Sequence, residues 1–403
     1  MSSQSCQDVL RRIDAAADQL RDQLVSLSLR IHANPEIAFQ EHEAARLLAA
    51  ALEEAGFQVE RGSAGMDTAF LAQWRGGGGG DRPAVAFVAE YDALPEVGHA
   101  CGHNIIGTAA AGAAMALKRA CPGLAGTLFV MGTPAEEGGG GKILMVNAGL
   151  FDAVDAALMI HPTTGESRIG STSLATSGLV INFRGKPAHA AGAPHKGINA
   201  LDAVVQTYVN VSLLRQHLAP DVRLHCLITK GGSVINIVPE EAEIRYLLRA
   251  SAREGVDLVT RRVRECAEGA GRATMATVSF VETSGYDERV PNKVLGDLFT
   301  LHLERVGVAM NPEPAPSGGS TDFGNVSKRV PASNAYVSIG PKEVASHSRE
   351  FAVCAASEAG HLALMNSVKA MAGAAYDVLC DAALRERAKQ EFDRRAAEAK
   401  AGQ

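Results

Sequence analysis

The chain has no long apolar run. Nowhere among its 403 residues do about 18 consecutive apolar residues occur, the length that a membrane-spanning helix requires. Its first residues, MSSQSCQDVLRRIDAAADQLRDQL, mix charged and apolar residues at helical spacing and contain no apolar signal-peptide core. We therefore expect a cytoplasmic protein with no membrane partner.

The chain also lacks an excess of basic charge. With 39 Lys and Arg against 45 Asp and Glu, its formal net charge is -6, so nucleic acid is not an expected partner. Its seven cysteines are an odd number and widely scattered, which does not indicate a disulfide framework. Two glycine runs, at 76–80 and 138–141, lack the flanking residues of a phosphate-binding loop.

Apolar patterning divides the chain into two parts. A length of 403 residues exceeds what one core of typical size needs, so we expect two domains. Over residues 1–177 and 288–403, short apolar runs alternate with helical stretches, which predicts an α/β domain with a mostly parallel sheet flanked by helices. Residues 178–287 follow a β-α-β-β-α-β order, which predicts an inserted α+β domain of ferredoxin-like type. Apolar spacing also predicts helices over 5–33, 41–56 and 355–379.

Potential metal ligands follow four of the apolar runs that we expect to be strands. They are Cys101 and His103 after AVAFVA, Glu136 and Glu137 after GTLFVM, His161 at the end of AALMIH, and His347 after AYVSIG. Each cluster alone has an ordinary explanation, such as a buried thiol, a solvated acid pair or a structural histidine. Together they would meet at one edge, because ligands collect outside the carboxyl ends of strands in an open parallel sheet. The sequence therefore predicts a metal site.

The donor types narrow the choice of metal. One thiolate, three imidazoles and one carboxylate suit zinc, with manganese, cobalt and nickel as alternatives. Five protein ligands exceed the number that one tetrahedral ion needs, whereas two ions that share a bridging ligand would use all five. We therefore expect two divalent ions as cofactors.

Several longer motifs resemble those of a known enzyme family. ACGH, PAEEGGGG, FRGKPAHAAGAPHKGINALDA, INIVPEEAEIRYLLRA and HSREF occur in the order and approximate spacing of the aminoacylase and carboxypeptidase family of co-catalytic metallopeptidases. The chain looks most like the branch that holds hippurate hydrolase and the indole-acetyl-amino-acid hydrolases. EYDALPEVGHACGHN and GSTDFGNVS resemble the p-aminobenzoyl-glutamate hydrolase and β-alanyl-dipeptidase type.

This resemblance implies a role for each ligand-type residue. Cys101 would bridge the two ions, with His103 and His161 completing one site and Glu137 and His347 the other. The same resemblance implies that the inserted domain is a lid and the interface of a homodimer or homotetramer.

The resemblance also implies a catalytic set. Glu136 would be the general base, and Asp92 would orient a metal-ligating side chain. His189 would stabilise the tetrahedral oxyanion, often in the active site of the neighbouring protomer. Asn236 and Arg249 would contact the substrate's amide or carboxylate, since a guanidinium binds carboxylates in bidentate fashion.

Two positions depart from the family pattern. Asn104 stands where many relatives of this branch have Asp, which removes a negative charge beside the expected metals. Glu90 stands where other branches have a metal-binding His, so that His103 would replace it as a ligand. Weak coordination by Glu90 is the alternative.

The expected function is therefore metal-dependent hydrolysis of the amide bond in an N-acyl or N-aminoacyl amino acid by a metal-activated water. N-acyl amino acids, p-aminobenzoyl-glutamate and β-alanyl dipeptides remain open as substrates. One alternative is a catalytically silent metal-binding protein on the same scaffold. The other is a thiol enzyme with Cys101 as nucleophile and His103 as base.

Overall fold

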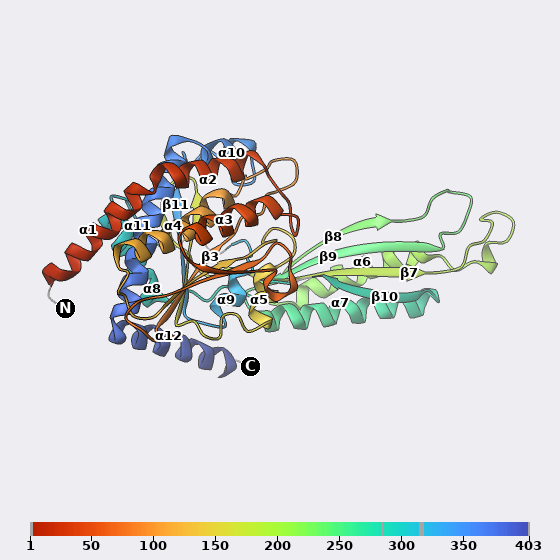
Figure 1. Cartoon of the computed structure of the whole chain (residues 1–403). Coiled ribbons are helices and arrows are strands. Elements are labelled where there is room, and N and C mark those ends of the chain that lie inside the picture. The colour runs from red at the N-terminus through yellow and green to blue at the C-terminus, as the bar shows by residue number, and fades with distance from the viewer. Residues whose placement is uncertain (1–2, 284, 314–317, 402–403) are drawn as a thin grey trace. The chain divides into compact units, whose positions relative to one another are not determined.

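The computed structural model describes residues 3–283, 285–313 and 318–401 of the chain. These residues form two compact units (Figure 1). Unit 2 consists of Ser173–Glu288 with Gly318–Ser320, and unit 1 contains the rest. Among the described residues, no helix is both long and apolar enough to cross a membrane.

Unit 1 is built on a seven-stranded sheet in the order β1-β2-β4-β3-β5-β11-β6. Its four inner strands are parallel and the outer ones pair antiparallel, which agrees with the expected, mostly parallel sheet. Every residue of the central strand, AVAFVA, is buried, as is typical of a parallel strand covered on both faces. The strands are β1 Gln58–Arg61, β2 Phe70–Arg75, β3 Ala84–Ala89, β4 Thr127–Gly132, β5 Ala156–Thr163, β6 Arg168–Ile169 and β11 Ala332–Ser338.

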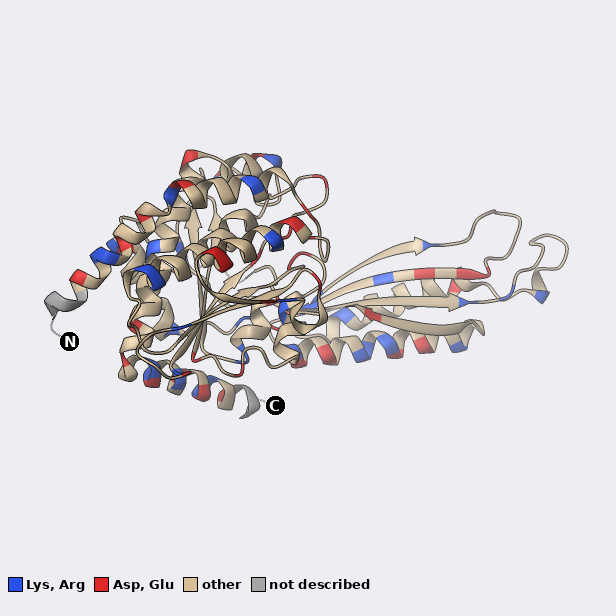
Figure 2. Ribbon diagram, viewed as in Figure 1, with Lys and Arg blue, Asp and Glu red and all other residues tan. Residues whose placement is uncertain are grey.

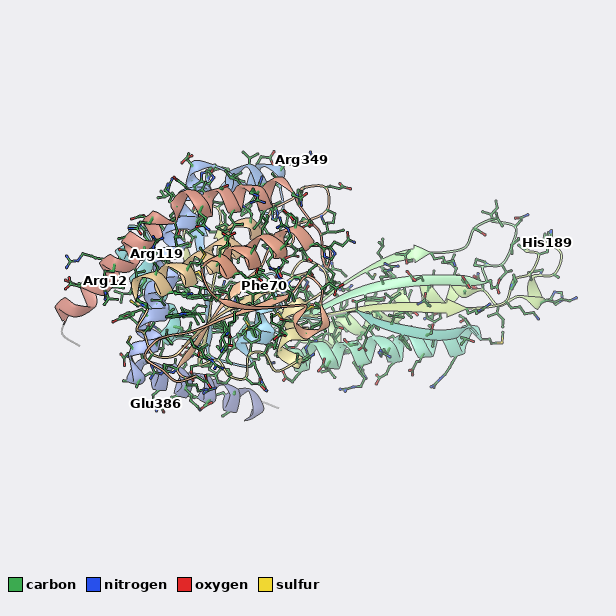
Figure 3. All side chains as sticks on the ribbon, viewed as in Figure 1. Arg12, Phe70, Arg119, His189, Arg349 and Glu386 are labelled. Carbon is green, nitrogen blue, oxygen red and sulfur yellow. The ribbon has the colours of Figure 1, made fainter. Side chains whose placement is uncertain are left out.

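Ten helices of unit 1 lie in the described part of the chain. The core helix α4 is rich in Ala and packs on β3 and β5 and against α1 and α11. Its small side chains let these elements approach closely. Figure 3 labels Phe70, which lies in β2 of the sheet, and four residues at the surface of unit 1: Arg12, Arg119, Arg349 and Glu386. The helices are α1 Ser3–Gln19, α2 Arg21–Ala33, α3 His42–Glu54, α4 His103–Ala120, α5 Gly141–Asn147, α8 Lys293–Arg305, α9 Phe323–Ser327, α10 Arg349–Ala355, α11 Glu358–Cys380 and α12 Ala382–Ala401.

Unit 2 is a four-stranded antiparallel sheet in the order β10-β7-β9-β8, packed against two helices. Alternate residues of β7, including Leu179, Ile181 and Phe183, are buried in the core of the unit. Charged residues are frequent on the long helix α7 and on α12 (Figure 2). The elements are β7 Ala175–Arg184, α6 Ala200–Leu214, β8 Arg223–Lys230, β9 Glu241–Ala250, α7 Arg253–Thr274 and β10 Thr277–Thr283.

The first strand of unit 2 lies beside its last. β10 pairs with β7 along seven residue pairs, from Thr277 opposite Arg184 to Thr283 opposite Gly178. Beyond this ladder, the backbone N–H of Thr176 donates to the carbonyl oxygen of Tyr286 at 2.8 Å. The chain therefore enters and leaves unit 2 along two hydrogen-bonded neighbours.

Two of the predicted helices have other bounds in the structure. The stretch 5–33 is interrupted at Leu20, so α1 and α2 are separate helices. The stretch 355–379 begins too early, because the Ser357 side chain accepts a hydrogen bond from the Gly360 N–H and starts a new helix there. The short edge strands β1 and β6 were not predicted.

Candidate metal centre

The potential ligands lie at one edge of the unit 1 sheet, because β3, β4, β5 and β11 run parallel. Cys101 lies in the connection from β3 to α4, and His103 is the first residue of α4. Glu136 and Glu137 lie between β4 and α5. His161 belongs to β5 itself, which continues to Thr163.

A glycine makes the Cys101–His103 turn possible. Gly102 has φ 75°, and a Cβ added there would lie 2.7 Å from Cγ of Pro162. Any other residue would therefore be strained by its backbone and would clash with the strand that carries His161. This turn brings the thiol and the imidazole close together at the start of α4.

Two groups of ligand atoms share the Cys101 sulfur. Cys101, His103 and His161 form one group, and Cys101, Glu137 and His347 form the other. Within each group the ligand atoms all lie within 4.8 Å of one another. The backbone N–H of the exposed His347, whose φ is 62°, donates to the carbonyl oxygen of Ala100. The geometry is thus compatible with two ions that share one ligand.

Asp92 orients one of the ligands. Its Oδ1 lies 2.9 Å from Nδ1 of His103, so Nε2 is the nitrogen left to bind a metal. Burial alone would lower the pKa of His103, but Asp92 reverses the effect and raises it well above its usual range. His161 is fixed in the same way, because its Nδ1 lies 2.6 Å from the carbonyl oxygen of Pro162.

Two of the candidate ligands have buried polar atoms without a hydrogen-bond partner, as expected for atoms that bind a metal. Within the described part of the chain, Nε2 of His103 and Oε1 of Glu137 are buried without a hydrogen-bond partner. Buried polar atoms are rarely left so, and a cation is a common explanation. Burial raises the pKa of the Cys101 thiol to about 12, which disfavours a free thiolate nucleophile and so argues against a thiol enzyme.

A buried lysine forms ion pairs with two acids next to the candidate ligands. Nζ of Lys142 lies 2.6 Å from Oδ1 of Asp322 and 2.8 Å from Oε1 of Glu90. Burial raises the pKa of Glu90, but the charge of Lys142, together with those of His103 and His161, outweighs it and the net shift is downward. Burial, with the charges of Glu90 and Asp322, raises the pKa of Glu136 well above its usual range. A raised pKa suits a carboxylate that takes up and returns a proton.

Three of the predicted site residues belong to unit 2. His189 lies in the loops beyond the ends of β7 and β8 (Figure 3), where Ile237 forms a bridge with it. The carbonyl oxygen of Asn236 accepts from the N–H of Ala190 in the same place. Arg249 lies at the other end of β9, with Nη1 3.1 Å from Oγ of Ser320. The first two residues are therefore close together, and the third is not.

Asn104 does not face the ligands. Its side-chain amide donates to Oγ of Ser28 and to the carbonyl oxygen of Ala355. The amide thus joins α4 to α2 and to the end of α10. The expected effect of this residue on charge beside the metals has no support in these contacts.

Sequence reasoning missed three buried residues at the site. Lys142 and Asp322 are described above, and Oε1 of Glu41 accepts the N–H of Ala135 at 2.8 Å. Lys142 carried a usable signal, because it directly follows two acids and four glycines. Asp322 stands in the motif GSTDFGNVS, but it was given no role there. No local pattern pointed to Glu41, because it contacts a residue far away in the chain.

Comparison with known proteins gives a consistent result. A family model described as peptidase family M20/M25/M40 matches residues 86–369. Over 397 residues, the chain is 37% identical to the mouse Xaa-Arg dipeptidase, covering 95% of this chain and 91% of the relative. It is 36% identical over 321 residues to one of the subunits of the p-aminobenzoyl-glutamate hydrolase of Escherichia coli, covering 75% of this chain and 66% of the relative.

Solved structures share the fold. An aminobenzoyl-glutamate utilization protein from Klebsiella pneumoniae matches with a TM-score of 0.73 at 22% identity, covering 91% of this chain and 98% of the other. A Bacillus subtilis protein described as a dinuclear metal binding peptidase matches with a TM-score of 0.67 at 22% identity, covering 90% and 99%.

Proposed function

The chain belongs to peptidase family M20/M25/M40, and from this premise we propose that it hydrolyses the amide bond of dipeptides or N-acyl amino acids with two divalent ions, zinc being the first choice. The observation that carries the proposal is the pair of ligand groups that share Cys101 beside Glu136. When bound, the ions would polarise the scissile carbonyl and lower the pKa of water.

The candidate ligands, Asp92 and Glu136 each have a defined role in this proposal. Cys101, His103 and His161 would hold one ion, and Cys101, Glu137 and His347 the other. Asp92 would keep His103 in the tautomer that leaves Nε2 as the ligand. Glu136 would take a proton from the attacking water and return it to the leaving amine.

The substrate class is tested first with dipeptides, because the mouse relative that covers most of the chain is named as a dipeptidase. The panel contains Xaa-Arg dipeptides, β-alanyl dipeptides, p-aminobenzoyl-glutamate and N-acetyl amino acids, and products are identified by mass spectrometry. Hydrolysis that stops with chelator and returns with metal supports the proposal. Full metal loading without hydrolysis of any member would favour the catalytically silent alternative.

Two exposed apolar surfaces of unit 2 support assembly into homodimers. β8 pairs with β9 along one side only in the described part of the chain, and its Leu227 is 65% exposed. An unpaired strand edge with apolar side chains readily accepts a second strand. On α6, apolar residues with large exposed fractions share one face: Val205, Tyr208, Val209 and Leu213.

The length of unit 2 supports a role for His189 in the active site of a second protomer. Arg249 and the loops holding His189 lie at opposite ends of β9, whose ten residues span about 30 Å. One dipeptide cannot contact both ends in the same protomer. We therefore assign Arg249 and His189 to the sites of different protomers.

Mixing two inactive variants tests this assignment. His189→Ala and Glu136→Gln protomers are unfolded together, refolded and assayed. A mixed dimer has one site with both Glu136 and His189, so random assembly should restore roughly a quarter of the wild-type activity. Sedimentation is measured in parallel. An active wild-type monomer, or mixed dimers without activity, would contradict the assignment.

A further inference from the structure

The ammonium group of Lys142 is completely buried among acids. Its side chain is 0% exposed, and its Nζ contacts Oδ1 of Asp322 and Oε1 of Glu90. The other Asp322 oxygen accepts the backbone N–H of Lys142 at 3.0 Å, so Asp322 holds this residue at both ends. Lysine is almost never fully buried unless it is paired.

A lysine at position 142 is expected to stabilise the fold less than an apolar residue would. Lys142 is the second residue of α5, where the positive end of the helix dipole disfavours a cation. A buried ion pair is also often no more stable than an apolar pair of similar volume. Positions that break several local rules are often functional.

The acids around Lys142 have the spacing of a metal site. Carboxylate oxygens of Glu90, Glu136 and Asp322 lie within 4.8 Å of one another, and all three side chains are buried. Nζ of Lys142 lies within hydrogen-bond distance of two of these residues. The ammonium is therefore a cation supplied by the chain to a set of acids that would otherwise attract one.

The same acids border the candidate metal centre. Oε2 of Glu90 lies 3.5 Å from Nε2 of His103, the nitrogen expected to bind a metal. The general base Glu136 precedes the ligand Glu137 in sequence. An ion held by Glu90, Glu136 and Asp322 would therefore occupy the base itself.

We propose that Lys142 is a positioning residue that excludes a further metal ion from Glu90, Glu136 and Asp322, and so keeps Glu136 a base instead of a ligand. The proposal rests on the proposed function, because it takes the ligand set and the role of Glu136 from it. Beyond that function, it states that Lys142 limits the number of bound ions to two.

The test counts metal ions in Lys142→Met, whose side chain has a similar length and no charge. Apoprotein is dialysed against buffered zinc, and zinc per chain is measured by elemental analysis. We expect two ions in the wild type and three in the variant. We also expect kcat to fall by about 100-fold with KM within about threefold, because the base is occupied.

A second variant separates positioning from stability. Lys142→Met/Asp322→Asn removes one of the three acids, so the additional ion should be lost and the count should return to two. Because no ion then occupies Glu136, kcat should rise by at least about tenfold above that of Lys142→Met. This variant removes both charges of the Lys142–Asp322 pair. If Lys142→Met does not fold, a double variant with two ions and kcat within about tenfold of the wild type supports the proposal, and one with two ions and a much lower kcat overturns it.

The outcomes are distinct. A Lys142→Met protein that is less stable but binds two ions, with unchanged kcat, would show a merely structural lysine and overturn the proposal. A double variant that binds two ions but keeps the low kcat of Lys142→Met would overturn it as well. A wild-type protein that binds zinc but hydrolyses nothing in the substrate panel would refute the proposed function, while the ion count of Lys142→Met would still decide the role of Lys142.

Discussion

Asp92 links His103 to Glu137. One carboxylate oxygen lies 2.9 Å from Nδ1 of His103, and the other accepts the backbone N–H of Glu137 at 2.9 Å. The acid is buried, and His103, with the Glu137 N–H, keeps its pKa below the usual range although burial opposes this. One side chain therefore orients two candidate ligands that lie 34 positions apart in the printed sequence.

Replacing this carboxylate should weaken metal binding. In Asp92→Asn, the amide cannot accept from both His103 and Glu137, so one of the two ligands loses its orientation. We expect the metal affinity, measured by competition with a chromophoric chelator, to fall by about 10–100-fold. Asp67→Asn, at an exposed position, is the control. Equal affinities in the two variants would contradict the role given to Asp92.

Replacing the general base should remove turnover and leave the metals in place. Glu136→Gln keeps the volume of the side chain but cannot carry the proton. We expect kcat to fall by about 100- to 10,000-fold, with the metal content of the wild type. The assay is run on metal-saturated protein, with metal measured in the same sample. Substantial activity in this variant would reject Glu136 as the base.

Metal affinity should rise steeply with pH. The pKa of the Cys101 thiol is raised to about 12 by burial, so at neutral pH this thiol must lose its proton when it binds a metal. Each unit of increase in pH should then strengthen binding by about tenfold from this residue alone. Titrations of apoprotein between pH 6 and 8 measure the slope, and Cys101→Ala should reduce it. An unchanged slope would exclude Cys101 as a ligand.

Glu41 should make the apoprotein less stable as pH rises. Burial raises its pKa from 4.5 to about 7 in the folded chain. Between these values the unfolded chain loses the proton and the folded chain keeps it, so the unfolding free energy falls as pH rises to about 7 and then levels. Glu41→Gln removes the buried charge, and its amide oxygen can still accept from Ala135.

The variant and the wild type are compared by thermal unfolding in chelator, because bound metal adds its own stabilisation. Relative to the wild type, Glu41→Gln should gain up to about 3 kcal/mol between pH 4.5 and pH 8. A difference that does not depend on pH would mean that the Glu41 carboxyl titrates normally.

The two domains could be predicted from the sequence, because apolar runs alternate with helical stretches in one part of the chain and follow a β-α-β-β-α-β order in the other. The break at Leu20 could not be predicted, since neither Pro nor Gly stands there to end a helix. His161 was expected to end its strand, but pairing with β11 carries β5 through Pro162 to Thr163. Such boundaries depend on neighbouring strands and not on local composition.

For the candidate site, sequence reasoning reached the residues that follow strands, because strand ends can be predicted locally. The roles assigned to Cys101 and the other ligands stay predictions that the experiments above test. The partnership of Lys142 with Asp322 could not be predicted, since 180 positions separate them and neither of the patterns in which they occur points to the other. Contacts of this kind emerge only when the chain is folded.

The pairing of β7 with β10 has an evolutionary consequence. Because the chain enters and leaves residues 173–288 along adjacent strands, this continuous part of unit 2 begins and ends at neighbouring points of the fold. Inserting or deleting this segment would leave β3, β4, β5 and β11 uninterrupted, because these strands lie outside it. Chimeras that exchange this segment between relatives would need few new linker residues.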